Sequence, residues 1–378
     1  MIGRADAGAL ALAERILAML DRGSFTATYK YAVLLGLLDL AMEQTSRSGV
    51  PPDSVTTAQL ADRVIELYWP HAVPFEAAHG VLRQNQGGQA EIVALVQRFR
   101  ERTGDRYAGL ERARRDRPAF AALRDKVERV LIEMPLPKLQ RVGTTNDPFL
   151  YSIAWDDQGR RPARGEVRKY QQGERSSFDN RLLLSPGVGD ALVRLNGMLR
   201  PLIYREWAVR VAELNNLPSA ELEQFLFGRD RAQLTAVSGD LLAAQESRCF
   251  YCGSRVRGAA QVDHFVPWSR YPNDRIENLV AADAGCNRRK SDHLAAAQHL
   301  RAWQARLETV DLSAIAALRA WPSSAEASRG VVGAIYRGLG DGVPLWREGD
   351  EFEPSRAAAI DAILLRYAAP HERGQGKH

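Results

Sequence analysis

Residues 249–293 decide how this chain is interpreted, and they read CFYCGSRVRGAAQVDHFVPWSRYPNDRIENLVAADAGCNRRKSDH. This stretch contains all three cysteines of the chain, Cys249, Cys252 and Cys286, and also an Asp-His pair at positions 263 and 264. Thiolate, carboxylate and imidazole groups are side chains that bind metal ions in proteins. The sequence therefore predicts a metal-binding centre in this one segment.

The local pattern of the segment predicts two short strands followed by a helix. Strand-forming side chains flanked by turn residues favour strands over residues 261–263 and 278–281, with a loop containing two prolines between them. A helix that begins near Ala284 places Asn287 about one turn in. From there the Asn287 side chain can reach back toward the end of the first strand.

The spacing of the cysteines favours a metal site over a disulfide framework. Cys249 and Cys252 are close enough in sequence for the chain to bend and bring two thiolates to one ion, and Cys286 can supply a third. Soft sulfur ligands select Zn²⁺ over Mg²⁺. Disulfide frameworks use an even number of cysteines in small secreted chains. A packed cluster of metal-free thiols stays open as the alternative.

These motifs together resemble the HNH (His-Asn-His) endonuclease family. Asp-His at 263–264, Asn-Leu at 278–279 and Cys-Asn-x-x-Lys at 286–290 stand in the order and spacing of that family. The resemblance extends to the zinc-bearing HNH domains of bacterial restriction enzymes and to the HNH domain of RNA-guided Cas nucleases. It implies two strands and one helix around a metal ion, the ββα-metal fold, and the cleavage of phosphodiester bonds in DNA.

The resemblance also implies the roles of four residues. His264 would be the general base, because an imidazole titrates near neutral pH. Asp263 and Asn287 would hold a catalytic Mg²⁺ or Mn²⁺ through oxygen ligands and leave positions open for phosphate oxygens and water. Asn278 would orient His264 through its backbone or its side chain. Each residue alone has an ordinary alternative, a surface turn or a solvent-facing amide.

One position departs from the family pattern at the zinc site. In relatives the fourth zinc ligand is commonly a Cys or His three residues before the last Cys, and here Asp283 holds that position. A carboxylate can bind zinc. We therefore expect a structural Zn²⁺ on Cys249, Cys252, Asp283 and Cys286. His293 and a water molecule are the alternative fourth ligands.

Basic and aromatic residues near the motif have both functional and ordinary interpretations. In this family Lys290 and Arg289 would lie within reach of the substrate phosphate, whereas an exposed charge is the ordinary alternative. Trp268 is expected to cover the loop after His264, with base stacking as the other possibility. Tyr251 is expected to pack inside the zinc knuckle.

The rest of the chain is predicted to be mostly helical. Apolar periodicity and capping residues predict helices over residues 10–20, 32–42, 57–69, 90–99, 116–134, 191–214, 231–245, 293–307, 313–321 and 354–368. Only residues 149–155 and 166–170 alternate like strands, which predicts a small β element in the middle of the chain.

The expected fold class is thus mostly α and multidomain. We predict a helical N-terminal domain over residues 1–110, a mixed α/β region over 111–228, the HNH module over 229–310 and a helical C-terminal extension over 311–378. A DNA-binding helix-turn-helix or winged helix and a helical domain that binds a protein partner are both open for the first of these.

Composition bounds the function without deciding it. The net charge of +5, with a pI near 9.2, is compatible with a nucleic-acid partner but also occurs in unrelated basic proteins. The apolar stretch over residues 31–42 is shorter than the roughly 20 residues of a membrane span. The first residues lack the basic and then apolar form of a secretion signal. We therefore expect a cytoplasmic protein that does not enter a membrane.

The expected function is that of a metal-dependent DNA endonuclease in restriction, phage defence or mobile-element biology. Two other classes stay open. One is a nucleic-acid-binding protein whose HNH fold does not cleave, and the other is an assembly protein that acts only when a partner recruits it.

Overall fold

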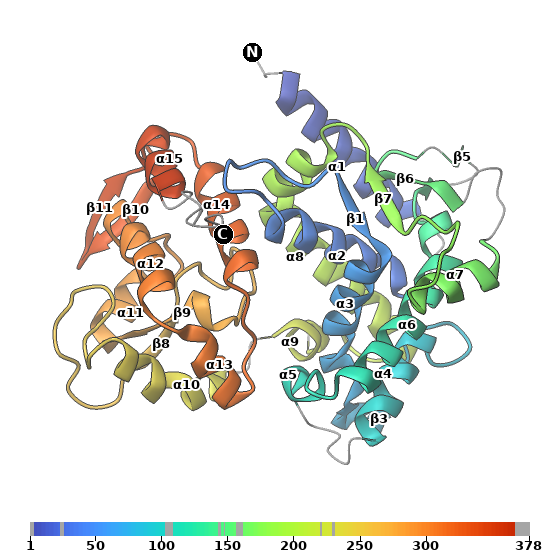
Figure 1. Ribbon diagram of the computed structural model, residues 1–378, viewed down its shortest axis with the longest axis horizontal. Helices are drawn as coiled ribbons and strands as arrows, with labels where there is room; N and C mark the ends of the chain where they lie inside the picture. The colour runs from blue at the N-terminus through green and yellow to red at the C-terminus, as the bar shows by residue number, and fades with distance from the viewer. Residues whose placement is uncertain are drawn as a thin grey trace, which may run out of the picture. The chain divides into compact units, whose positions relative to one another are not determined.

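The structure is a computed structural model. It describes the residues of the following ranges: 4–22, 26–102, 109–142, 145–146, 148–155, 162–219, 221–228 and 231–366. The chain divides into two compact units, Met1–Met42 with Pro51–Arg229 and Glu43–Val50 with Asp230–His378 (Figure 1). Helices dominate and the sheets are small, which confirms the mostly α fold class. Within the described ranges, no helix has the length and apolar character that a membrane crossing requires.

The first unit is built from helices joined by short strands and 3₁₀ turns. Its elements are α1 (Arg4–Arg22), α2 (Tyr29–Glu43, of which Glu43 is counted with the second unit), β1 (Ser54–Thr56), α3 (Thr57–Tyr68), η1 (Pro70–Ala72), β2 (Pro74–Phe75), η2 (Glu76–Ala78), β3 (Gly80–Val81), α4 (Glu91–Arg102), α5 (Leu110–Ala113), α6 (Arg117–Glu133), η3 (Leu136–Lys138), β4 (Arg141–Val142), β5 (Thr145–Asn146), β6 (Tyr151–Ile153), α7 (Arg164–Gln171), β7 (Arg181–Leu184), α8 (Val188–Asn215) and α9 (Leu222–Phe227).

One apolar cluster runs through this whole unit, from Ala9 to Leu226. It joins side chains of α3, α4 and α6, so the core continues across residue 110, where we had expected a domain boundary. The expected boundary after residue 228 lies next to the division between the two units. Apolar side chains on both sides of position 110 bury one another, and this is why the first two predicted domains form one body.

Capping residues begin two helices of the first unit where the sequence predicted. The Thr56 side chain accepts a hydrogen bond from the Gln59 amide at 3.2 Å, and the Gln59 side chain accepts one from the Thr56 amide at 2.9 Å. This reciprocal capping box satisfies two amides at the start of α3. The Asp116 side chain caps α6 by accepting from the Ala119 amide at 3.2 Å. Both pairs fix where the chain turns into a helix.

Two expectations for the first unit were wrong. Residues 166–170, expected as a strand, lie in α7, where the Lys169 amine donates to the Glu166 carboxylate one helical turn away at 2.7 Å. The strand that pairs with β6 is instead β7, which also pairs with β1 in an antiparallel sheet of order β1-β7-β6. In α1, Leu10 and Leu17 are exposed, and the helix buries a neighbouring stripe that includes Leu12 and Ile16.

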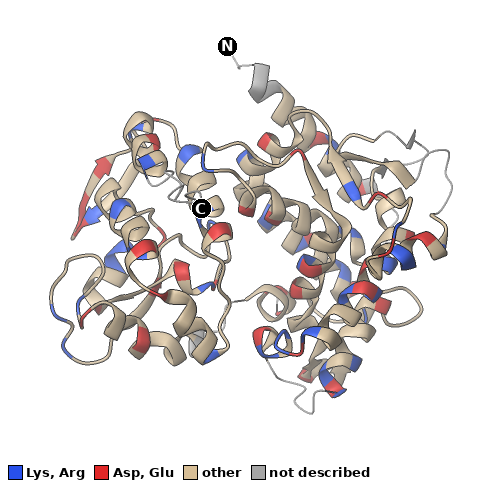
Figure 2. Cartoon of the chain, viewed as in Figure 1, with Lys and Arg blue, Asp and Glu red and all other residues tan. Residues whose placement is uncertain are grey.

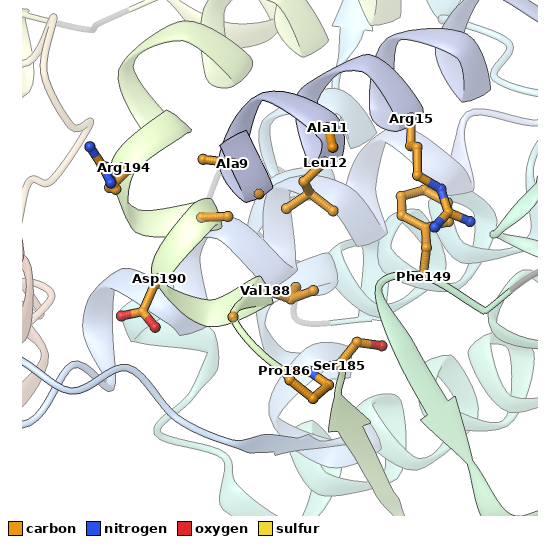
Figure 3. A pocket seen from close by; sticks show the side chains of 13 residues that line it. Ala9, Ala11, Leu12, Arg15, Phe149, Ser185, Pro186, Val188, Asp190 and Arg194 are labelled. Atoms are coloured by element: carbon orange, nitrogen blue, oxygen red, sulfur yellow. The ribbon is translucent and has the colours of Figure 1, made fainter. Parts of the chain in front are cut away.

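A cavity of about 400 Å³ in the first unit lies beside α1 and the start of α8 (Figure 3). The guanidinium group of Arg15 lies over the ring of Phe149, 4.2 Å from its centroid. The residues that line the cavity include no histidine and no cysteine, and most are apolar or small. The chemically reactive side chains singled out in the sequence belong to the second unit.

The second unit carries the predicted strand-strand-helix element. Its elements are α10 (Arg231–Ala244), β8 (Gln261–His264), η5 (Ile276–Asn278), β9 (Leu279–Ala282), α11 (Ala284–Lys290), α12 (Ala297–Thr309), α13 (Leu312–Arg319), α14 (Ala325–Arg337), β10 (Pro344–Glu348), β11 (Glu351–Pro354) and α15 (Ala357–Arg366). Side chains of α10 and α13 form an apolar cluster with Leu279 and Ala281 of β9. The short hairpin β8-β9 thus has a core of its own.

The end of the chain differs from the prediction in three places. Helix α12 begins at Ala297 rather than at residue 293, because α11 ends at Lys290 and a turn separates the two helices. Helix α14 and the antiparallel hairpin of β10 and β11 were not expected. The expected cap at Asp230 and the polar tail over residues 371–378 lie outside the described residues.

Candidate active site

Strand β8 and helix α11 place two polar pairs on one side of the hairpin. Strands β8 and β9 run antiparallel, with Asp263 opposite Val280 and His264 opposite Leu279. Because side chains alternate along a strand, Gln261 and Asp263 share one face of β8. Helix α11 covers this face, since the Asn287 amide donates to Gln261 Oε1 at 2.6 Å and Lys290 Nζ lies 3.0 Å from Asp263 Oδ2.

One oxygen of the Asp263 carboxylate is held from two sides. Oδ2 accepts a hydrogen bond from the Tyr251 hydroxyl at 2.5 Å and pairs with Lys290. Burial, followed by the nearby Asp263 carboxylate, raises the pKa of Tyr251 well above its usual value, so the phenol stays protonated and can donate. The second oxygen, Oδ1, has no partner among the described residues. It is the atom that this carboxylate can offer to a cation.

Asn287 presents its amide oxygen in the same space between strand and helix. Its Nδ2 is committed to Gln261, and its Oδ1 accepts no hydrogen bond from the residues that the structure describes. Oxygen atoms of a carboxylate and an amide are ligands that Mg²⁺ accepts. The structure therefore brings Asp263 and Asn287 to one side of β8, with one oxygen of each left over. Their donor set fits a hard divalent cation.

Lys290 differs from the sequence-based expectation. The side chain is fully buried, and its amine donates to the backbone carbonyl of His264 at 2.8 Å in addition to pairing with Asp263. An amine in this position cannot contact a phosphate at the surface, so the expected substrate contact of Lys290 is corrected to a buried contact with the Asp-His pair. Arg289, the neighbouring residue, is exposed, and its phosphate contact stays a prediction.

Asn278 holds the loop that follows His264. Its side chain accepts from the Val266 amide at 2.9 Å and donates to the Val266 carbonyl at 3.1 Å and to the Asn273 carbonyl at 3.0 Å. Its own carbonyl accepts from the Phe265 amide at 2.7 Å. No contact with the imidazole ring itself is recorded for the buried Asn278 side chain. Asn278 can thus act on His264 through the backbone of the two residues that follow it.

The His264 ring has one engaged nitrogen and one unengaged nitrogen. Nε2 lies 2.7 Å from Asp274 Oδ1, whereas Nδ1 is buried and has no hydrogen-bond partner among the described residues. Trp268 is half-buried and packs edge-on against the ring, with centroids 5.6 Å apart. A buried polar atom without a partner is rare in a folded protein and calls for a missing water, ion or substrate. The meeting of the His264 ring with Asp263 and Asn287 around one ion stays a prediction.

The three cysteines meet at a second, separate cluster. Ligand atoms of Cys249, Cys252, Asp283 and Cys286 all lie within 4.8 Å of one another. Four ligands about 2.3 Å from one tetrahedral Zn²⁺ would be roughly 3.8 Å apart, so small movements would suffice for coordination. The cluster can therefore hold a metal ion such as zinc. His293 is not part of this group; its ring packs against Phe352 with centroids 4.8 Å apart.

The Asp283 carboxylate divides its two oxygens between helix and cluster. Oδ1 caps α11 by accepting from the amides of Gly285 at 2.9 Å and Cys286 at 3.0 Å. Oδ2 lies 3.4 Å from Cys252 Sγ, on the side of the thiols. Burial opposes ionisation of Asp283, but hydrogen bonds from the Cys286 and Cys249 thiols and from the Cys286 amide lower its pKa strongly. Asp283 is therefore a carboxylate that faces the three sulfur atoms.

Burial has the opposite effect on the thiols. It raises the pKa of Cys249 to about 11 and raises that of Cys286 further. Thiols in such surroundings lose their protons when a divalent cation binds, because the cation stabilises the thiolate. The chemistry of this donor set fits Zn²⁺ on three sulfurs and one carboxylate oxygen.

Sequence reasoning missed Asp274 and the polar role of Tyr251. Asp274 lies in the loop between β8 and β9, and only the folded loop brings its carboxylate to His264. Tyr251 packs inside the knuckle as expected, but it also donates to Asp263. The spacing of the motif contains no signal for either contact. An acidic residue a few positions before Asn278 is a weak signal that could have pointed to Asp274.

Comparison with known families agrees with this geometry. The HNH endonuclease family matches residues 249–296, which include both strands, α11 and the cysteine cluster. The chain thus carries an HNH endonuclease domain, and the sequence resemblance is confirmed. A second family, described as a domain of unknown function (DUF8808), matches residues 8–226, more than half of the chain, so the chain belongs to that family. None of the curated proteins or solved structures that were compared matches the chain.

Charge alone does not mark a nucleic-acid surface on this protein. Figure 2 shows basic and acidic residues interspersed along the elements of both units. Several of the basic residues are engaged in ion pairs, for example Arg319 with Asp240 at 2.6 Å and Arg337 with Asp361 at 2.9 Å. The link to nucleic acid therefore rests on the HNH domain rather than on the net charge of +5.

Proposed function

We propose that this protein is a metal-dependent endonuclease that hydrolyses phosphodiester bonds in DNA. The observation that carries the proposal is the pair of unengaged oxygens, Asp263 Oδ1 and Asn287 Oδ1, next to a histidine whose Nδ1 has no partner among the described residues. The match of residues 249–296 to the HNH endonuclease family supports the same conclusion.

The residues of the chain have distinct tasks in this reaction. His264 is the last residue of β8 and follows Asp263 directly, so a phosphodiester across this end of the strand would meet both side chains. His264 Nδ1 takes the proton of the attacking water, and that nitrogen is the unprotonated one if Nε2 donates to Asp274. Lys290 and Tyr251 hold Asp263 Oδ2 and thereby aim Oδ1 outward.

Asp263 and Asn287 would hold Mg²⁺ or Mn²⁺. Such an ion, when bound, stabilises negative charge on the phosphate and on the departing oxygen. Arg289 is exposed on α11 and would contact a phosphate of the same strand. The DNA, the magnesium and these residue roles are parts of the proposal that supercoiled DNA and defined metals can test.

The cysteine cluster has a structural task in this proposal. Asp283 caps α11, the helix that carries Asn287 and Lys290, so a zinc ion on the cluster would fix the start of this helix against Cys249 and Cys252. The knuckle also contains Tyr251, which donates to Asp263. Loss of zinc would therefore loosen the residues that hold the catalytic ion.

The first unit is proposed to select the DNA or to bind a partner. It matches the domain of unknown function over residues 8–226 and is too large to serve as a linker. We place the protein in restriction, phage defence or mobile-element biology on the strength of the HNH domain. A cytoplasmic location is consistent with reduced thiols in a zinc cluster.

The test is cleavage of supercoiled and linear DNA by the purified chain in Mg²⁺, Mn²⁺ or EDTA, with the product ends mapped. We expect nicking or linearisation in Mg²⁺ or Mn²⁺ and none in EDTA. Asp263→Asn should abolish it, and Asp350→Asn, a change at an exposed turn, should leave it intact. Tight DNA binding without cleavage under every metal condition would favour the binding protein instead, and cleavage unaffected by Asp263→Asn would exclude this site.

A further inference from the structure

From these contacts we infer that Asp274 is the positioning residue of the general base and that Glu43, far away in the sequence, holds the loop that presents it. The inference rests on the proposed function, because it assigns a partner to His264 in the same site. It begins from the 2.7 Å contact between His264 Nε2 and Asp274 Oδ1.

This contact determines which ring nitrogen can act as a base. A carboxylate only accepts hydrogen bonds, so Nε2 is the nitrogen that carries the hydrogen. In the neutral imidazole the proton-free nitrogen is then Nδ1, the one that is buried without a partner in the described part of the chain. The pair thus fixes the tautomer and the plane of the ring. The logic is that of the aspartate in serine protease triads, which orients a histidine without taking up its proton.

The loop around Asp274 is held rigidly by its neighbours on both sides. The Asp274 carbonyl accepts from the Trp321 indole at 2.6 Å. The Asn273 carbonyl accepts from Asn278, and the Asn273 side chain accepts from the Arg275 amide at 3.0 Å, which forms an Asx turn around Asp274. A carboxylate on such a loop has little freedom to leave the histidine.

Glu43 closes this arrangement from a distant part of the sequence. One oxygen, Oε1, accepts from the Tyr271 hydroxyl at 2.9 Å and from the Arg275 guanidinium at 2.8 Å. Glu43, Tyr271 and Arg275 are all buried. These two bonds hold the loop one residue after Asp274 and three residues before it. Buried charge pairs of this kind fix geometry, because a displaced partner leaves a charge without compensation.

The segment of residues 43–50 therefore belongs to the working nuclease unit. Glu43 is the last residue of α2, and it is grouped with residues 230–378 rather than with the rest of that helix. A motif search that stops at residue 249 leaves out this contribution. The family match to residues 249–296 contains Asp274 but not Glu43.

The test measures the cleavage step and DNA binding separately. For Asp274→Ala we expect the single-turnover cleavage rate to fall about 10- to 100-fold, part of what a positioned base contributes. The dissociation constant for DNA in EDTA should stay within about twofold, and the zinc content should not change. Asp274→Asn keeps an acceptor oxygen and should lose less, while Asp350→Ala, a control at an exposed site, should lose nothing.

Glu43→Ala tests the anchor. We expect it to slow the same step, and the double variant with Asp274→Ala should be no slower than Asp274→Ala alone, because Glu43 acts through that residue. A wild-type rate for Asp274→Ala, a loss of DNA affinity that matches the loss of rate, or additive effects of the two changes would each overturn the inference.

A spectroscopic readout separates this inference from the proposed function. In protein labelled with ¹⁵N-histidine, the His264 ring signals, assigned with His264→Ala, should show the Nε2–H tautomer, and Asp274→Ala should shift them. If the chain cut no DNA but kept this tautomer, only the proposed function would fail. If the wild-type ring carried its hydrogen on Nδ1, the positioning role would be refuted even in an active nuclease.

Discussion

The buried position of Lys290 leads to a prediction that separates two roles for the same residue. Replacing Lys290 by Met keeps the length of the side chain but removes the amine. The Asp263 carboxylate then keeps only Tyr251 on Oδ2, and the His264 carbonyl loses its partner. If Lys290 were a surface residue in contact with phosphate, the same change would leave the fold intact.

The magnitude follows from the contacts. Removal of one partner of a buried ion pair costs about 3–5 kcal/mol. We take the lower end, about 3 kcal/mol, because Tyr251 still donates to the carboxylate. For a unit of this size 1 kcal/mol corresponds to about 2–4 °C, so the melting temperature of the second unit should fall by about 6–12 °C. A surface contact would change stability by less than about 0.5 kcal/mol.

The assay combines thermal unfolding with DNA binding over a range of salt concentrations in EDTA. We expect Lys290→Met to lower the melting temperature and to leave the salt dependence of binding unchanged. Arg289→Gln is the matched control at the next position, which is exposed. It should leave the melting temperature unchanged and reduce the salt slope by about one phosphate contact. A Lys290→Met protein that melts like the wild type but binds DNA with a smaller salt slope would refute the buried role.

Two further expectations concern the zinc cluster and acid stability. Asp283→Ala should reduce the zinc content from one per chain to none by elemental analysis and should destabilise α11 by about 1 kcal/mol through the lost cap; full zinc occupancy in this variant would show that Asp283 is not a ligand. Burial lowers the pKa of His71 to about 3, whereas the unfolded chain has a pKa near 6.5, so the unfolded state binds more protons between these values. The stability of the first unit should therefore decrease as the pH falls from about 6.5 toward 3, by about 2 kcal/mol at pH 5. His71→Gln should lack this part of the pH dependence in denaturant titrations, and an unchanged pH profile in the variant would contradict the assignment.

The strand-strand-helix element could be predicted from sequence because each part of it is encoded locally. Strand-forming residues lie at β8 and β9, and Asp283 stands where a capping residue is needed before α11. The cysteine cluster was also predictable, since the Cys-x-x-Cys spacing by itself brings two thiols together. Local signals of this kind do not depend on the rest of the fold.

The interior contacts of the site could not be predicted in the same way. Lys290 reads as a surface charge on a short basic helix, and its burial becomes visible only when Tyr251 and Asp263 meet around it. Glu43 lies more than two hundred residues from the loop that it holds. Such contacts are set by how distant segments pack, and no spacing within a motif encodes them.

The error at α7 has a different cause. A five-residue stretch that alternates polar and apolar side chains fits a strand, but it also fits little more than one turn of a helix, and here the Glu166–Lys169 pair supports the helix. The strand β7 was missed because its three consecutive leucines do not alternate, although its partners β1 and β6 bury one side of it.

The most direct test of the account is the single-turnover cleavage of one DNA by the wild-type protein and by His264→Ala in Mg²⁺, at equal zinc content. We expect rapid Mg²⁺-dependent cleavage by the wild type and a loss of at least about 100-fold in the variant, because general-base catalysis supplies that much. Equal rates for the two proteins would contradict the claim that the His264 imidazole drives phosphodiester hydrolysis at this site.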